Sequence, residues 1–380
     1  MKTVMHNIGS FFNRVWKKVL QPFLKKSAPA FIAIGIGIFL GFIIMLIFNP
    51  RSAMNATITL LFSGFTSVRS IGNVLYSSAP IILTGLAVAL AFKSGLFNIG
   101  ASGQMMVATF TAMLIGIYLA GTPFVWILAT LGAILAGAFW AMIPGLMKAF
   151  ANVNEVVTSI MMNYIGAYMF SMIIDEFLES TAKPQFSRPM PQASQLPTLS
   201  SIFSGSNANI GIFIAIGVAI LIHIIIHKTT LGYRLKASGF SMDGSKYAGM
   251  NTKANIVIAM TLSGALAGLA GAVVSLAPNI DYSTSFMIFP EGYDGISVSL
   301  IGLGEPIGTI FAGLFMGLIK EGTFLVQRYD FDENVMRIIQ GIIIYSIAVS
   351  TAIQLGWKKA IKWIKSRAKK DEVKMEGEQS

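Results

Sequence analysis

Apolar runs close to the length of a membrane span recur along the whole chain. About 20 apolar residues are needed to cross the hydrocarbon core of a bilayer as a helix, and the run from Ala28 to Phe48 is the first of this length. Hydrophobic residues make up 54% of the chain and charged residues 12%, with a mean hydropathy of +0.69. A soluble domain carries about 25% charged residues, and the long alternating patterns of membrane strands are absent. The sequence therefore predicts an all-α, polytopic membrane helical bundle.

The net charge of +11 is concentrated in short basic segments beside the apolar runs. This distribution is typical of cytoplasmic flanks of membrane spans, so we expect membrane lipids around the chain and no nucleic acid as partner. Residues 1–27 carry six basic residues, no acidic residue and apolar residues at helical spacing, which predicts an interfacial amphipathic helix on the cytoplasmic leaflet. Residues 357–380 are predicted to form a basic cytoplasmic tail. The run at 28–48 is too long for the core of a signal peptide, so we interpret it as an uncleaved span.

The transmembrane domain is predicted to cover residues 28–356. Further spans are expected near 79–92, 97–119, 124–147, 155–174, 209–227, 254–276 and 335–356, with a broken region at 284–320. Splitting that region at Gly302–Pro306 keeps the basic tail cytoplasmic. It places the acidic stretch 320–334 outside and the basic loop 228–253 inside. The prediction is about ten membrane elements with broken or re-entrant helices, both termini in the cytoplasm and one sizeable extracellular loop at 175–208. A partial crossing at 57–72 is an alternative.

Several classes of chemistry are excluded by residue content. The chain has no cysteine, so disulfides, thiolate metal sites and cysteine catalysis are ruled out. His223 and His227 lie one helical turn apart, but no third ligand is evident, so we expect helix-end or packing roles and no metal site. The segment GFSMDGSK at 239–246 resembles a phosphate-binding loop, but its Ser and Lys are in the wrong order and no strand precedes it. We therefore predict no catalytic residue, no cofactor and no enzyme activity of its own.

Two interruptions in the apolar pattern are candidate parts of a translocation path. Phe97–Gln104 and Phe289–Gly295 set polar residues among glycines inside apolar surroundings. Such backbone is tolerated at membrane depth only where protein or a water-filled cavity surrounds it, and it is the best sequence pointer to a transport path. The candidates are Phe97, Asn98, Gln104 and Asp294. The alternative is that both stretches are ordinary loops at helix ends.

A third polar stretch opens the helix expected at 155–174. Asn154 and Glu155 lie at its start, where a carboxylate suits the positive end of the helix dipole. Simple capping explains these two residues as well as substrate binding does. Asn163 and Tyr164 lie two turns deeper, where polar side chains must face a partner or a cavity. Three glycine pairs are spaced for close helix contact: Gly37 and Gly41, Gly264 and Gly268, and Gly313 and Gly317.

Four segments carry a resemblance to a known family. They are GLFNIGASGQMMVA (95–108), NVNEVVTSIMMNYI (152–165), GYRLKASGFSMDGSKYAGMNTKANIVIAMTLSGALAGLAGA (232–272) and FPEGYDGISVSLIGLGEPIG (289–308). The chain resembles the permease subunits of bacterial ABC importers for nucleosides, within the ribose and branched-chain amino acid permease group. The second segment favours nucleoside-type members. One departure is Ala101-Ser102, where many members carry Ala-Glu.

The resemblance implies that the protein is located in the bacterial plasma membrane and has three partners. These are a second, related permease, an ABC ATPase subunit that uses the ATP, and an extracellular substrate-binding lipoprotein. The ATPase is expected on Arg234–Gly249, with Ser241–Tyr247 as a coupling helix that moves the spans at 209–227 and 254–276. The coupling residues implied are Arg234, Lys236, Gly239, Ser241, Asp243, Lys246, Tyr247 and Gly249.

A nucleoside is neutral, with a flat base and a sugar rich in hydroxyl groups. Asn98, Gln104, Asn163 and Asp294 could supply hydrogen bonds, and Phe97 or Tyr164 a stacking surface. An ABC permease for a sugar or an amino acid is the first alternative. A secondary transporter driven by an ion gradient is the second, although the few intramembrane carboxylates count against it. An intramembrane enzyme is the third, and it lacks a nucleophile–base pair.

Overall fold

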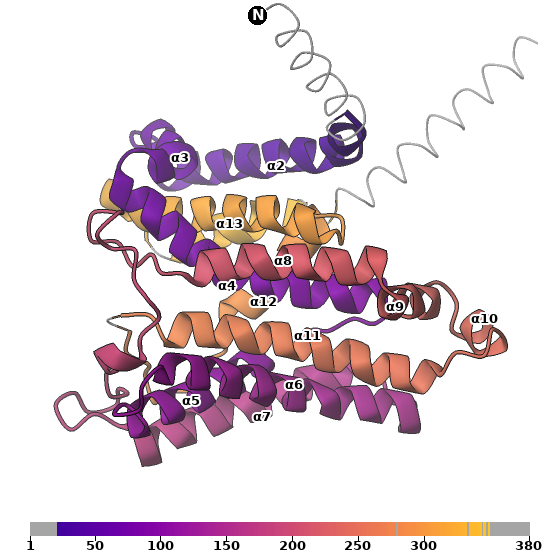
Figure 1. The fold of residues 1–380 in the computed structure, drawn as a ribbon. Helices are drawn as coiled ribbons and strands as arrows, with labels where there is room; N and C mark the ends of the chain where they lie inside the picture. Colours follow the sequence, from indigo (N-terminus) through magenta and orange to yellow (C-terminus); the bar gives the residue numbers. More distant parts are fainter. Residues whose placement is uncertain (1–20, 279, 333, 344, 347–348, 350–380) are drawn as a thin grey trace, which may run out of the picture. The chain divides into compact units, whose positions relative to one another are not determined.

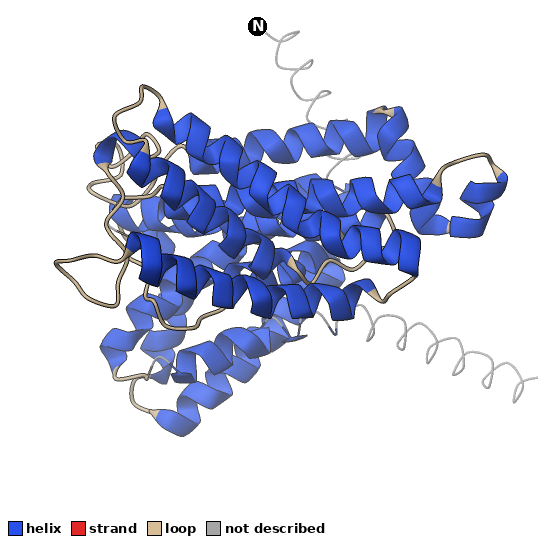
Figure 2. Ribbon diagram, turned by 90° about the horizontal axis from the view of Figure 1, so that it is seen from below, coloured by secondary structure: helices blue, strands red, loops and turns tan. Residues whose placement is uncertain are grey.

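The computed structural model describes residues 21–278, 280–332, 334–343, 345–346 and 349. Within these residues the regular elements are helices, joined by loops that contain three isolated β-bridges (Figure 2). The all-α prediction is therefore confirmed for the described chain. The predicted interfacial helix at 1–27, apart from its last residues, and the basic tail at 357–380 lie outside the described residues. The chain divides into two compact units, residues 1–54 with 334–380 and residues 55–333.

The first unit contains α2 (Gln21–Phe48) and a short helix at Asn334–Ile343. These two helices approach closely at the glycines of α2. A Cβ atom added to Gly37 would lie 2.8 Å from the Cα of Ile343, and one added to Gly41 would lie 2.8 Å from a methyl carbon of Ile339. Because no side chain fits at either position, the packing role predicted for this pair is confirmed. The helix α2 also covers the first predicted span, whereas the span expected at 335–356 is described only in part.

The second unit is a bundle of long helices. Its elements are α3 (Ala53–Phe62), η2 (Ser63–Phe65), α4 (Val68–Lys93), α5 (Ala101–Tyr118), α6 (Val125–Ala151), α7 (Glu155–Ile173), η3 (Ile174–Leu178), η4 (Gln192–Ser194), α8 (Gly211–Lys228), α9 (Thr230–Phe240), α10 (Met242–Tyr247), α11 (Thr252–Ser275), α12 (Pro290–Ile301), α13 (Pro306–Val326) and η5 (Gln327–Tyr329). Among the described residues, seven helices are long and apolar enough to cross a membrane: α4, α5, α6, α7 with η3, α8, α11, and α13 with η5.

The break predicted at Gly302–Pro306 is present. Helix α12 ends at Ile301 and α13 begins at Pro306, whose missing N–H and fixed φ suit the first position of a helix. With 12 residues, α12 is about 18 Å long. This length is too short to cross a bilayer, so α12 is a half-helix packed along α4 and α13.

Small residues let the central helices approach closely. Helix α11 packs against α4, α5 and α6. A Cβ atom on Gly137 of α6 would lie 2.7 Å from the Cα of Gly268 and 2.5 Å from the carbonyl oxygen of Gly264. On α13, a Cβ atom on Gly313 would lie 3.3 Å from the Cα of Ile82, and one on Gly317 would lie 2.8 Å from the carbonyl oxygen of Val74. The packing roles predicted for both pairs are confirmed.

Two predicted boundaries are wrong. Helix α4 begins at Val68 instead of near 79, because Ser67 caps it by accepting a hydrogen bond from the Ser70 N–H (3.1 Å). Its first half is only partly buried: Ser70, Gly72 and Ser78 are buried, whereas Val68 and Ile71 are exposed. Helix α13 continues to Val326, so Lys320 and Glu321 do not lie in an outer loop. Both find partners inside the protein, Lys320 at Glu291 and Glu321 at Asn73 of α4 (3.1 Å).

The two ends of this unit are built differently. At one end, the long loop at 175–208 folds back over the bundle. Ser194 donates a hydrogen bond to the carbonyl oxygen of Gly116 (2.5 Å), and the Leu196 N–H donates to the carbonyl oxygen of Leu276 (2.9 Å). At the other end, α9 and α10 connect α8 to α11 and extend past the long helices (Figure 1). The extracellular and coupling segments predicted from the sequence thus lie at opposite ends.

Candidate transport and coupling sites

The two predicted interruptions meet inside the bundle. Ser102, in the first turn of α5, donates a hydrogen bond to the carbonyl oxygen of Phe289, directly before α12 (2.9 Å). The backbones touch, since a Cβ atom on Gly292 would lie 2.6 Å from the Cα of Ser102. The N-termini of two helices, which carry partial positive charge, therefore converge. Transporters build sites from discontinuous helices of this kind.

Three side chains form a buried amide network beside this junction: Asn98, Gln104 and Ser263. Asn98 Nδ2 donates to Gln104 Oε1 (2.9 Å) and to Ser263 Oγ (2.7 Å), and Gln104 Nε2 donates back to Asn98 Oδ1 (2.9 Å). Asn98 Oδ1 also accepts the N–H of Gly100 (2.9 Å). Asn98 is 0% and Gln104 1% exposed. In this conformation their hydrogen-bonding groups are used within the protein, and the network fixes the non-helical stretch against α11.

Asn163 performs a similar role from α7. Its Oδ1 accepts the N–H of Gly103 (2.8 Å) and its Nδ2 donates to the carbonyl oxygen of Ile99 (3.0 Å). A Cβ atom at Gly103 would lie 2.8 Å from the Cα of Asn163, so the glycine permits this contact. Asn163 Nδ2 also lies 3.4 Å from the hydroxyl of Tyr293, which is 39% exposed. Asn163 thereby joins the buried junction to a surface residue of α12.

A charged cluster of Glu291, Asp294 and Lys320 lies between α12 and α13. Lys320 Nζ lies 2.6 Å from Glu291 Oε1 and 3.7 Å from Asp294 Oδ2, and all three side chains are mostly buried. The sequence singles out Asp294 and the stretch that contains Glu291. It does not predict their pairing with Lys320, because the stretch 320–334 is expected outside the membrane. A single lysine inside the apolar run GLFMGLIKEG was the available signal.

The two aromatic candidates lie in different surroundings. The Phe97 ring is half-buried and stacks on Phe92, with centroids 5.0 Å apart. Tyr164 is 46% exposed, and its ring stacks at 6.3 Å on Phe286, which also contacts Tyr168 at 4.8 Å. Tyr164, Tyr168 and Phe286 therefore form an aromatic surface patch, whereas Phe97 is part of the packing.

Asn154 and Glu155 cap α7 and join it to α6. Asn154 is the N-cap and accepts the N–H of Val156 (2.9 Å). Glu155 forms an ion pair with Lys148 at the end of α6 (3.0 Å). These contacts match the capping alternative that the sequence left open.

The α9–α10 segment (Thr230–Tyr247) is anchored at its base. Leu235 is buried in an apolar cluster with residues of α4, α6 and α11, and Asn255 Nδ2 donates to Ser238 Oγ (2.7 Å). Gly239 lies against the turn after α4, where a Cβ atom would be 2.8 Å from the Gly95 nitrogen. The base of this segment is therefore in direct contact with α4, α8 and α11.

The outer part of the segment is exposed. Phe240 is 96% and Tyr247 is 94% exposed, and Arg234, Asp243 and Lys246 also face solvent. Ser241 caps α10 by accepting the Gly244 N–H (3.0 Å), and Gly249 follows it with a φ of +77°, a conformation that favours glycine. An open groove of about 520 Å³ separates α9 from α10, lined by Tyr233, Lys236, Ala237, Phe240, Ser241, Gly244, Ser245, Ala248 and Met250. Aromatic residues and arginine, such as Phe240, Tyr247 and Arg234, are enriched at protein docking surfaces.

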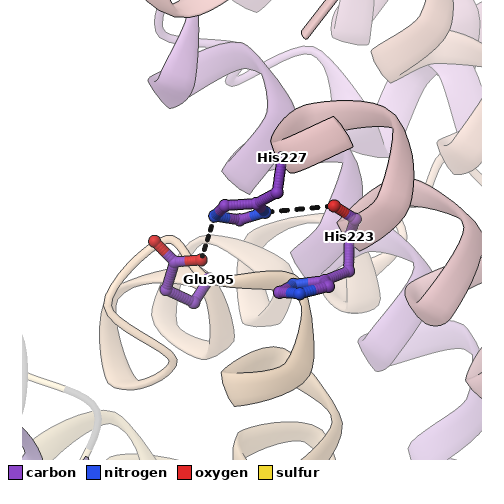
Figure 3. Close-up of side chains that lie close together, drawn as sticks. All are labelled: His223, His227 and Glu305. Atoms are coloured by element: carbon purple, nitrogen blue, oxygen red, sulfur yellow. Dashed lines mark hydrogen bonds and ion pairs between the residues drawn. The ribbon is translucent and has the colours of Figure 1, made fainter. Parts of the chain in front are cut away.

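A second polar group lies near the base of this segment. No third ligand for His223 and His227 was evident from the sequence, but the structure brings Glu305 to them from the turn before α13 (Figure 3). Glu305 also forms an ion pair with Lys93, the last residue of α4 (2.5 Å).

Membrane-length helices, two interrupted helices that meet inside the bundle and an anchored projection at one end define a membrane transport subunit. The family model for the permease component of branched-chain amino acid transport systems matches residues 70–348, and the chain belongs to this family. It is accordingly a multi-pass membrane protein and a transport subunit, with no enzymatic role of its own.

Three relatives illustrate the similarity. The chain is 36% identical over 333 residues to the guanosine ABC transporter permease protein NupP of Bacillus subtilis, covering 85% of this chain and 93% of the relative. It is 34% identical over 370 residues to the nucleoside ABC transporter permease protein NupB of Lactococcus lactis, covering 95% and 99%. A second permease of Bacillus subtilis, the guanosine ABC transporter permease protein NupQ, is 28% identical over 254 residues, covering 65% and 79%. No solved structure gives a significant match.

Proposed function

We propose that this chain is the membrane permease subunit of an ABC importer that carries nucleosides across the bacterial plasma membrane. A separate ATPase subunit supplies the energy. The observation that carries the proposal is the similarity, over nearly the full chain, to permeases named for guanosine and nucleosides. The exposed α9–α10 segment gives this assignment a physical basis, because it offers the ATPase a surface at the end opposite the loop at 175–208.

The coupling follows from the way in which the segment is anchored. Tyr247, Phe240 and the basic residues Arg234 and Lys246 would contact the ATPase, while Gly239 and Leu235 hold the base of the segment against the bundle. Closure of two ATPase subunits on ATP would displace the segment together with α8 and α11. The path would then open alternately to either side, as in rigid-body switching.

The substrate path in this proposal runs along the face that carries Glu291, Tyr293 and the aromatic patch of Tyr164 and Phe286. These side chains are partly exposed and offer a stacking surface with hydrogen-bonding groups at its edge, as a neutral nucleoside needs. Asn98, Gln104 and Asn163 support this face from behind by holding the two interrupted helices together. Asp294 contributes through its contact with Lys320.

The arrangement in the membrane is also part of the proposal. About ten membrane elements, with both termini in the cytoplasm, agree with the distribution of basic residues. A second, related permease would complete the path, because two different permeases of Bacillus subtilis are similar to this chain. A substrate-binding lipoprotein would dock on the folded loop at 175–208.

The test is uptake by the assembled transporter in proteoliposomes. We expect transport of radiolabelled guanosine or uridine that needs ATP and an active ATPase subunit, and that unlabelled nucleosides inhibit. Ribose, glucose or leucine should not compete, and competition by one of them would favour the related sugar or amino acid permease. Uptake driven by an ion gradient without the ATPase would overturn the proposal and support a secondary transporter.

A further inference from the structure

His223, His227 and Glu305 form a compact group of potential metal ligands at the end of α8. The two histidines lie one helical turn apart, with ring centroids at 4.4 Å. Glu305 faces them from the turn between α12 and α13 (Figure 3). One ligand atom from each residue lies within 4.8 Å of the other two. Two histidines spaced i, i+4 on a helix are a recurring arrangement for holding zinc.

The hydrogen bonding of His227 is compatible with a cation between His227 and Glu305. Its Nδ1 lies 3.0 Å from the backbone carbonyl oxygen of His223. A carbonyl oxygen can only accept, so Nδ1 carries a hydrogen. In a neutral imidazole, Nε2 then bears a lone pair, and this lone pair faces the Glu305 carboxylate at 3.4 Å. Two acceptors face one another at this distance unless a proton or a metal ion lies between them.

Two features of the contact between His227 and Glu305 match those of known metal sites. Ligating histidines generally donate their other ring N–H to a carbonyl or carboxylate group, which orients the ring. With metal–ligand bonds of about 2.0–2.1 Å, neighbouring ligand atoms of a tetrahedral zinc site lie about 3.3 Å apart, close to the observed 3.4 Å. His223 Nδ1 is buried and has no hydrogen-bond partner within the described residues. This nitrogen is thus not engaged by a hydrogen bond that a metal ion would have to replace.

The surrounding charges leave the ligand atoms available. Lys93 Nζ contacts Glu305 Oε1 at 2.5 Å, whereas Oε2 is the oxygen that faces His227. Lys93 thereby orients the carboxylate without occupying the ligand position. Lys228, the residue after His227, is exposed.

We propose that His223, His227 and Glu305 bind a divalent transition metal ion of the zinc type, with water completing the coordination. Nitrogen and carboxylate ligands in this combination suit zinc or cobalt better than magnesium or calcium. The bound ion joins the end of α8, which leads into the α9–α10 segment, to the start of α13. The proposed metal site would be the same whichever substrate the permease carries.

The test uses the purified full-length chain in detergent, with any affinity tag removed, titrated with Co²⁺ and read by visible absorption. We expect one equivalent with the spectrum of tetrahedral nitrogen and oxygen coordination, which Zn²⁺ displaces. His223→Ala, His227→Ala and Glu305→Gln should each weaken binding at least about tenfold, the size of effect seen even for groups that only orient a ligand. His6→Ala is the matched control and should bind as the parent chain does.

Thermal melting without metal separates loss of binding from loss of fold. Zn²⁺ should raise the melting temperature of the parent chain and of His6→Ala, but not of a His223→Gln/His227→Gln variant whose metal-free melting is unchanged. Equal Co²⁺ spectra in the parent and the double variant, or no binding to the parent chain, would overturn the proposal. Neither readout depends on transport.

Discussion

The buried amide network and the α9–α10 segment differ in how far their functional side chains are exposed to solvent. At the junction of the interrupted helices, Asn98 and Gln104 are almost completely buried and bonded to each other. At the end of the bundle, Phe240 and Tyr247 are almost completely exposed and contact little of their own chain. The first region is complete within one chain, whereas under the proposed function the second is completed by the ATPase subunit. Substitutions in the first should therefore cost stability, and substitutions in the second should cost assembly.

The largest effect is expected at the charged cluster. Lys320→Met leaves Glu291 and Asp294 without their cation, and breaking a buried ion pair costs about 3–5 kcal/mol. The thermal melting of the purified protein measures this loss. Lys183→Met is the matched control, since it removes the more exposed pair with Asp281, worth about 0–1 kcal/mol. Equal melting temperatures for the two variants would show that the cluster is not part of a buried core.

Close helix packing should give the next largest effect. Gly268→Leu forces a side chain into the contact of α11 with Gly137 of α6, and overpacking costs about 1–3 kcal/mol or more. Gly217→Leu places the same side chain in open space on α8 and should be nearly neutral. The yield of monodisperse protein and its melting temperature compare the two variants. A well-folded Gly268→Leu variant would contradict the packing described here.

The amide network gives the sharpest test of the comparison. Asn98→Leu removes the hydrogen-bond partner of the buried Gln104 amide and of the Gly100 N–H, at about 1–3 kcal/mol for each group left unpaired. Asn207→Leu changes an exposed residue. If the network is structural, the melting temperature falls in Asn98→Leu but not in Asn207→Leu. Reduced nucleoside uptake with unchanged melting would instead make Asn98 a direct substrate contact and break the comparison.

The smallest effect on stability is expected at the α9–α10 segment. Phe240→Ala and Tyr247→Ala remove exposed rings, so the melting temperature should stay the same. If these rings anchor the ATPase, each substitution should cost about 2 kcal/mol of binding free energy. The affinity for the ATPase subunit then falls roughly 30-fold, which co-purification measures. Phe213→Ala, an exposed ring on α8, serves as the control and should retain the ATPase. Unchanged ATPase binding in the Phe240 and Tyr247 variants would place the docking surface elsewhere.

Features with a local physical signal were predictable from the sequence. The packing glycines were predicted from their spacing, and the break at Gly302–Pro306 from the distribution of basic residues. The helix that follows Ser241 was implied by the resemblance to ABC permeases. Features that depend on distant partners were not. The sequence places Lys320 outside the membrane, because hydropathy and the distribution of basic residues contain no information about its pairing with Glu291. Likewise, Asn98 was expected to face a cavity, because its partner Ser263 is remote in sequence, and Glu305 could not be connected to the two histidines.

The most direct test of the account is the side of the membrane on which α10 lies. Because the chain contains no cysteine, a single Tyr247→Cys substitution can be labelled selectively with a membrane-impermeant maleimide. Thr181→Cys, in the exposed loop at the opposite end, provides the reference. We predict that Cys at 181 is labelled in intact cells, and that Cys at 247 is labelled only in inverted vesicles or after permeabilisation. Labelling of position 247 from outside intact cells would contradict the coupling role of α9–α10.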